Sequence, residues 1–149
     1  MFDIHIEEFY LDCCKILNQL YQSFPKKRAV FVEDISGADQ PDEYGVHSDR
    51  FLSCFGAMIW LADEGFIQFE TTIRQEAIDE ACLTSQGLRL LSAITRLPEL
   101  DDLREKLASD NPSLTFKPNI DTLRLLMRKG TSTQLGVAMH HLLHEHKQT

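Results

Sequence analysis

The chain has 149 residues, of which 43% are hydrophobic and 26% are charged. This composition is ordinary for a globular domain and excludes a chain that is disordered throughout. The first residues lack the basic start and apolar run of a secretory signal, and the apolar stretch over 51–62 is too short to span a bilayer. We therefore expect no membrane association.

The formal net charge is −8, and it is distributed unevenly. Residues 113–149 contain five Lys and Arg residues against two acidic ones, a net charge of +3, which leaves −11 on residues 1–112. Sequence-independent DNA binding depends on clustered Lys and Arg, so an acidic body disfavours it. A local basic patch is still compatible with this distribution.

The four cysteines are Cys13, Cys14, Cys54 and Cys82. Their spacing fits neither a zinc framework nor a redox Cys-x-x-Cys pair. Cysteines in such a pattern are usually small buried hydrophobes in a reducing compartment. The pattern predicts a cytoplasmic protein, and we expect no cofactor.

The first predicted elements are a helix, a strand and a loop. Apolar residues recur every three or four positions over 5–24, which indicates an amphipathic helix that Pro25 ends. Residues 29–32 are β-prone and apolar and predict a short strand. The polar residues 36–43 are rich in turn formers and predict a loop.

Ser48 is a favourable N-cap for the next helix, which we expect to end before a left-handed cap at Gly65. Helical spacing of 100° per residue predicts a core stripe on this helix. The stripe consists of Phe51, Phe55, Met58 and Ala62, flanked by Leu52 and Ile59. The opposite face carries Ser53, Gly56, Ala57, Trp60, Asp63 and Glu64.

The middle of the chain predicts a two-stranded wing. Residues 66–71 alternate as a half-buried strand, and a return strand is expected over 78–83. Thr84 is suited to cap a further helix over 85–95. The C-terminal third predicts three more helices, over 97–107, from Asn119 or Asp121 to Gly130, and from Thr131 or Ser132 onward.

The order of these elements over residues 5–95 resembles the winged-helix superfamily. Two segments carry the resemblance: Trp60-Leu61-Ala62-Asp63-Glu64-Gly65-Phe66-Ile67, and Leu83-Thr84-Ser85-Gln86-Gly87-Leu88-Arg89-Leu90-Leu91. The first resembles the end of a recognition helix entering the wing, and the second resembles the exit from the wing. The resemblance implies a mainly α fold with a small β-wing over residues 1–95. A C-terminal helical extension, residues 96–149, would pack on this domain or on a second copy.

The sequence departs from that family in two respects. Residues 36–47 are mostly loop formers, so the helix before the recognition helix is short or displaced. Winged-helix DNA binders also present basic or amide side chains to the major groove. Here residues 47–91 contain seven acidic residues against three basic ones, so this surface is expected to repel phosphate.

The first functional hypothesis is a non-enzymatic module that binds a partner protein or forms a homodimer, through the Trp60 face or through the C-terminal helices. Trp60 stands among Ser53, Ala57 and Glu64 on the predicted outer helix face, and Trp is common at interface hot spots. The alternative for Trp60 is packing beneath the C-terminal helices of its own chain.

The second hypothesis is a DNA-binding transcription regulator of the winged-helix type that dimerises through residues 97–147. Its DNA contacts would come from Lys26, Lys27, Arg28, Arg50 and Arg74. The competing interpretation of the basic trio is that it complements the negative end of the first helix dipole.

His140 and His144 are one helical turn apart, which is compatible with a shared metal ion, although no third ligand is evident. A solvated polar face is the simpler interpretation, and we predict no metal site. The sequence also lacks Gly-x-Ser-x-Gly, a phosphate-binding Gly-rich loop and His-Glu-x-x-His. We therefore predict no enzyme activity.

Overall fold

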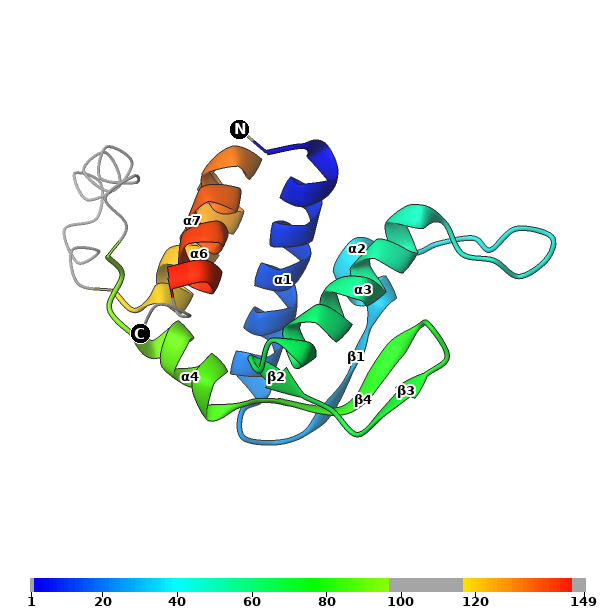
Figure 1. Ribbon diagram of the computed structural model, residues 1–149, viewed down its shortest axis with the longest axis horizontal. Coiled ribbons are helices and arrows are strands. Elements are labelled where there is room, and N and C mark those ends of the chain that lie inside the picture. The colour runs from blue at the N-terminus through cyan, green and yellow to red at the C-terminus, as the bar shows by residue number, and fades with distance from the viewer. Residues whose placement is uncertain (1, 97–116, 146–149) are drawn as a thin grey trace. The chain divides into compact units, whose positions relative to one another are not determined.

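The computed structural model describes residues 2–96 and 117–145, so the helix predicted over 97–107 lies outside the described residues. Within these ranges the chain forms six helices and a small antiparallel sheet (Figure 1). The prediction of a mainly α-helical chain with a small β component is confirmed. The chain separates into two compact units, one of Asp12–Leu88 and one of Met1–Leu11 with Arg89–Thr149.

The first helix, α1 (Ile4–Ser23), forms where the three- and four-residue apolar spacing predicted it. It contributes residues to both units. Its fully buried side chains repeat with that spacing and are Cys13, Ile16, Leu17 and Leu20. Pro25 follows the end of the helix, where its missing N–H cannot continue the hydrogen-bond ladder.

The sheet of the Asp12–Leu88 unit has its longest strand in the middle. Its strands are β1 (Arg28–Phe31), β2 (Ile67–Gln68), β3 (Thr71–Ile73) and β4 (Ala77–Leu83). All three short strands pair antiparallel to β4, with the order β1-β4-β2 and with β3 also on β4. The single strand predicted over 66–71 is therefore split into β2 and the start of β3.

Strand β4 contains an irregularity opposite β1. Arg28 pairs with Ala81 whereas Val30 pairs with Ile78, so β4 has one extra residue between these two pairs. Glu80 adopts a positive φ of 53° at this point, which is the left-handed conformation of a bulge residue. Such a bulge bends the strand and increases its local twist.

Two helices, α2 (Val32–Ser36) and α3 (Asp49–Asp63), precede β2 in the same unit. The five-residue α2 is too short for its periodicity to be recognised in the sequence, although its Val32 and Ile35 are buried. The predicted cap of α3 is confirmed, because the Ser48 hydroxyl accepts a hydrogen bond from the Phe51 backbone N–H at 3.3 Å. Gly65 has a φ of 85°, as expected of a left-handed residue after a helix.

The buried face of α3 differs from the predicted stripe. Its buried residues are Phe51, Cys54, Ala57, Met58 and Leu61. Phe55 and Ala62, which were predicted to be central, are only half-buried. Because α3 carries apolar residues on most of its circumference, the periodicity favoured a stripe rotated from the one that is buried.

Thr84 and Gly87 determine how α4 (Ser85–Ser92) begins. The Thr84 hydroxyl donates to the Gly65 carbonyl at 2.6 Å and accepts from the Gly87 backbone N–H at 3.0 Å, so the predicted cap is confirmed. A Cβ on Gly87 would lie 2.1 Å from the Phe66 carbonyl oxygen. The glycine therefore permits a close approach between the helix and the backbone that enters β2.

The second unit contains α6 (Asn119–Lys129) and α7 (Ser132–Glu145). Both helices occur where the sequence predicted them. Thr131 and Gln134 form a reciprocal capping box at the start of α7: each side chain accepts a hydrogen bond from the other residue's backbone N–H, at 2.9 and 3.1 Å. In the same unit, the Tyr10 hydroxyl lies 2.6 Å from His140 Nδ1, which joins the start of α1 to α7.

Candidate protein-interaction loop

The predicted surface around Trp60 is not a continuous exposed patch. Trp60 is half-buried, and its ring lies 6.4 Å from that of buried Phe66 with an interplanar angle of 27°. Ser53 is exposed and Glu64 is half-buried. The placement of Ala57 on an outer face is wrong, because this residue is only 1% exposed. Ala57 belongs to the core because the buried stripe of α3 is rotated from the predicted one.

Arg50, a predicted DNA-contacting residue, forms an ion pair within its own unit. Its two terminal nitrogens each donate to one oxygen of Asp12 at 2.7 Å. The Asp12 side chain is 1% exposed, whereas that of Arg50 is 34% exposed. A buried carboxylate without a cation is strongly unfavourable, so Arg50 has a structural role that competes with any nucleic-acid contact.

The other predicted basic contacts lie in separate parts of the same unit. Lys27 Nζ pairs with Glu70 Oε1 at 3.1 Å, and both side chains are more than half exposed. Lys26 is exposed, and half-buried Arg28 donates from Nε to the carbonyl of Ala29. Arg74 is exposed in the turn between β3 and β4.

Two histidines of α7, His140 and His144, lie close together. The His140 and His144 rings have centroids 4.4 Å apart. Burial, followed by the charges of His144 and His141, lowers the pKa of His140 from its ordinary value. Among the described residues no group of three potential ligands could hold a metal ion.

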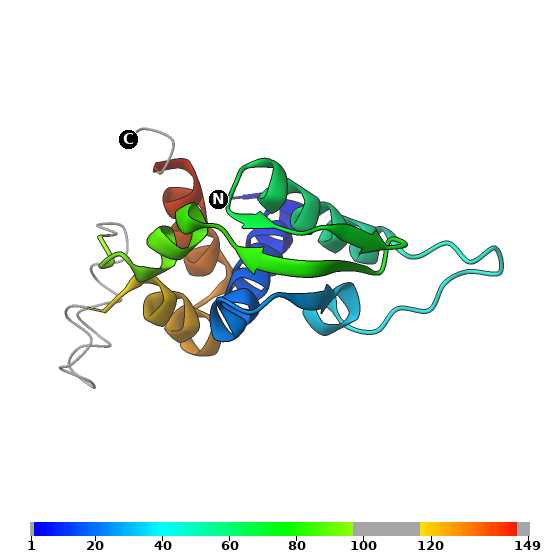
Figure 2. The same cartoon turned by 90° about the horizontal axis from the view of Figure 1, so that it is seen from below.

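The loop between α2 and α3 is largely exposed in the Asp12–Leu88 unit. We refer to residues 37–47 as the Tyr44 loop. Figures 1 and 2 show it projecting from the helices and sheet of its own unit as a narrow finger. Tyr44 is 83% exposed and Val46 is 54% exposed, so two apolar side chains lie at the tip of a polar loop.

Asp42 organises the tip of the Tyr44 loop. Its Oδ1 accepts hydrogen bonds from the backbone N–H groups of Tyr44 and Val46, at 2.9 and 3.0 Å. Its own backbone N–H donates to the Val46 carbonyl at 2.9 Å, which closes the turn. Gly45 has a φ of 78°, a conformation that glycine adopts without steric cost. Tyr44 and Val46 are therefore presented from a defined turn.

His47 and Asp39 hold the base of the loop. Asp39 Oδ2 accepts from the Ser48 backbone N–H at 2.9 Å and lies 3.2 Å from His47 Nδ1. The other His47 nitrogen lies 3.3 Å from Glu76 Oε1, and the ring stacks on Phe51 at 4.0 Å. The hydrogen bond from Ser48 is the main cause that lowers the pKa of Asp39. This carboxylate therefore stays ionised at neutral pH.

The chain segment that contains the loop is acidic. Residues 33–49 contain six Asp and Glu residues and no Lys or Arg. The sequence predicts an ordinary turn-rich loop over 36–43, and that pattern does not single out Tyr44 or Val46. One signal was available in the sequence. Tyr44 and Val46 flank Gly45, and they follow Asp42 by two and four positions, a spacing at which an Asp side chain can accept hydrogen bonds from backbone N–H groups.

The chain has no significant match among protein-family models, curated proteins or solved structures. Within the described ranges, none of the helices combines the length and apolarity that a membrane crossing requires.

Proposed function

We propose that this chain is a non-enzymatic, winged-helix-like protein-interaction module of the cytoplasm that binds a partner protein through the Tyr44 loop. The observation that carries the proposal is the exposure of Tyr44 and Val46 on a turn that Asp42 fixes. A large aromatic side chain in water gains hydrophobic free energy when a partner covers it. A loop that is already ordered loses less entropy on binding than a disordered one.

The charge around the loop indicates the chemistry of the partner. With six acidic residues and no Lys or Arg over 33–49, the loop favours a protein surface that has an apolar pocket rimmed by Lys and Arg. The same charge disfavours nucleic acids and anionic lipid surfaces, because both repel it. Tyr44 would fill the pocket, and the carboxylates would pair with the rim.

The order of helices and strands supports the winged-helix part of the proposal. The order α1, β1, α2, α3, then the strands β2 to β4, then α4 agrees with the order that the sequence resemblance implies. DNA binding by such a domain receives less support. Arg50 is paired with buried Asp12, and Lys27 is paired with Glu70.

Selection of displayed random peptides on the immobilised full chain tests the proposal. We expect enriched peptides to contain an aromatic or aliphatic residue flanked by at least two Lys or Arg residues. A Tyr44→Ser variant should bind them at least tenfold more weakly, and their binding should weaken as salt rises. Because Tyr44 is exposed, its replacement should leave the unfolding midpoint unchanged.

Ile73→Ser is the matched control, because Ile73 is another exposed apolar residue of the same unit, at 39%. The Ile73→Ser variant should bind the selected peptides with the same affinity as the unmodified chain. Enriched peptides that are acidic, or that bind Tyr44→Ser as tightly as the unmodified chain, would contradict the proposal. A dimer in light scattering that Tyr44→Ser converts to a monomer would also contradict it, because the occupant would then be a second copy.

A further inference from the structure

Asn119 has a buried carbonyl-type oxygen whose orientation is fixed. The Asn119 side chain donates from Nδ2 to the Leu90 backbone carbonyl at 2.7 Å. Since that carbonyl can only accept, the amide nitrogen must face it, and Oδ1 must point the other way. The residue is only 5% exposed, and its Oδ1 has no hydrogen-bond partner among the described residues. Such a buried acceptor is unfavourable unless something donates to it.

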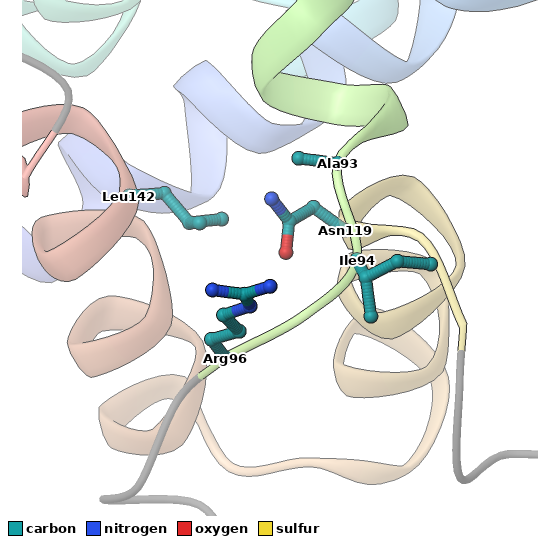
Figure 3. Close-up of a pocket in the computed structure, with 5 residues that line it drawn as sticks. All are labelled: Ala93, Ile94, Arg96, Asn119 and Leu142. Atoms are coloured by element: carbon teal, nitrogen blue, oxygen red, sulfur yellow. The ribbon is translucent and has the colours of Figure 1, made fainter.

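A pocket of about 320 Å³ lies beside this side chain. It is lined by Ala93, Ile94, Arg96, Asn119 and Leu142, all in the unit that contains α6 and α7. Figure 3 shows the Asn119 oxygen and the Arg96 guanidinium facing one another across its interior. Among the described residues that line it, Arg96 is the charged one. Ala93 and Leu142 contribute apolar side chains to the lining, whereas the Ile94 side chain points away from Asn119 and Arg96 (Figure 3).

These groups define a ligand by complementarity. The Arg96 guanidinium offers parallel N–H donors in the geometry that a carboxylate accepts. Asn119 Oδ1 requires an O–H or N–H donor close to that carboxylate. The volume is at the lower end of the range for small-molecule sites, and the apolar walls suit a short aliphatic group. We infer that this pocket binds a small aliphatic carboxylate that carries a hydroxyl or amino group beside its carboxyl group.

Four related compounds test the inference by calorimetric titration of the full chain. The probes with both required groups are 2-hydroxy-4-methylpentanoate, whose donor is a neutral O–H, and leucine, whose donor at neutral pH is a cationic ammonium N–H. 4-Methylpentanoate lacks the donor, and 2-hydroxy-4-methylpentanamide lacks the negative charge. We expect the hydroxy acid or leucine to bind at least tenfold more tightly than either incomplete compound.

Arg96→Met tests the role of the guanidinium without disturbing the core, because Arg96 is exposed. It should lower affinity for the better ligand at least tenfold. Arg128→Met, on an exposed position of α6 outside the pocket, is the matched control and should bind normally. The inference is overturned if no probe binds at millimolar concentration, if 4-methylpentanoate binds as tightly as the complete ligands, or if Arg96→Met binds like the unmodified chain.

Discussion

Gly87→Ala should destabilise the Asp12–Leu88 unit strongly. The added Cβ would lie 2.1 Å from the Phe66 carbonyl oxygen, about 1.3 Å closer than an ordinary contact at 3.4 Å. The obstacle is backbone, so a side-chain rotation cannot relieve it, and such overpacking costs about 1–3 kcal/mol. Displacing the helix start also weakens the hydrogen bond from Gly87 N–H to Thr84, a cap that contributes about 1 kcal/mol. We therefore expect a loss of about 3 kcal/mol.

Gly56→Ala provides a control of opposite sign. Gly56 lies in the middle of α3, and nothing lies within 4 Å of a Cβ added there. Replacing a helical glycine by alanine should stabilise the protein by about 0.5–1 kcal/mol. In urea unfolding followed by circular dichroism, with a slope of about 2 kcal/mol per M, Gly87→Ala should lower the midpoint by about 1.5 M. Gly56→Ala should raise it slightly. Equal midpoints for the two variants would refute the packing described between α4 and Phe66.

Three further predictions concern the buried charges, the thiols and one histidine. Arg50→Ala should cost about 3 kcal/mol in the same urea assay, because it leaves the Asp12 carboxylate buried without its cation; a cost below about 1 kcal/mol would contradict this. Burial raises the pKa of the Cys13 thiol, and it raises the pKa of the Cys14 and Cys54 thiols to about 12. All three cysteines are free and buried, so a thiol reagent at pH 8 should modify them only as fast as the protein unfolds. Folding lowers the pKa of His140 below its ordinary value of 6.5, so the unfolded chain binds this proton more readily than the folded chain. The free energy of unfolding should therefore fall as the pH drops from above 6.5 through the lowered pKa. Thermal melts at pH 7.5 and 5.5 measure this, and His140→Gln should reduce the difference; an unchanged difference would show that His140 contributes nothing.

Much of the helical structure could be predicted because its signals are local. The hydroxyls of Ser48 and Thr84 cap the helices that follow them, and Gly65 has the left-handed conformation that its position predicted. Each of these interactions joins residues that are close in sequence. Hydrophobic periodicity was sufficient for α1 for the same reason.

Features that depend on distant partners could not be predicted. The Asp12–Arg50 pair joins residues 38 positions apart, and nothing in either local sequence specifies it. The rotation of α3 that buries Ala57 depends on which neighbouring elements cover the helix, and periodicity alone gives two adjacent candidate stripes. The orientation of Asn119 Oδ1 depends on a carbonyl 29 residues earlier in the chain.

The exposed apolar residues of the Tyr44 loop could not be predicted for a different reason. Charged clusters and rare residues are the usual sequence signals of a site, and in this chain they are Trp60, the basic trio and the α7 histidines. Exposure of an apolar residue is a property of the folded chain, because sequence patterns do not distinguish a buried loop aromatic from an exposed one. Here Tyr44 lies in water because Asp42 closes the turn beneath it.

The central claim is that Tyr44 contacts a basic surface of another protein, and site-specific photo-crosslinking in cells tests it most directly. A photoreactive phenylalanine analogue placed at position 44 should cross-link to one partner, on a peptide where Lys or Arg flanks apolar residues. The same analogue at exposed Ile73 should give no such product. Cross-links at 44 that map to acidic peptides, or no difference between positions 44 and 73, would contradict the account.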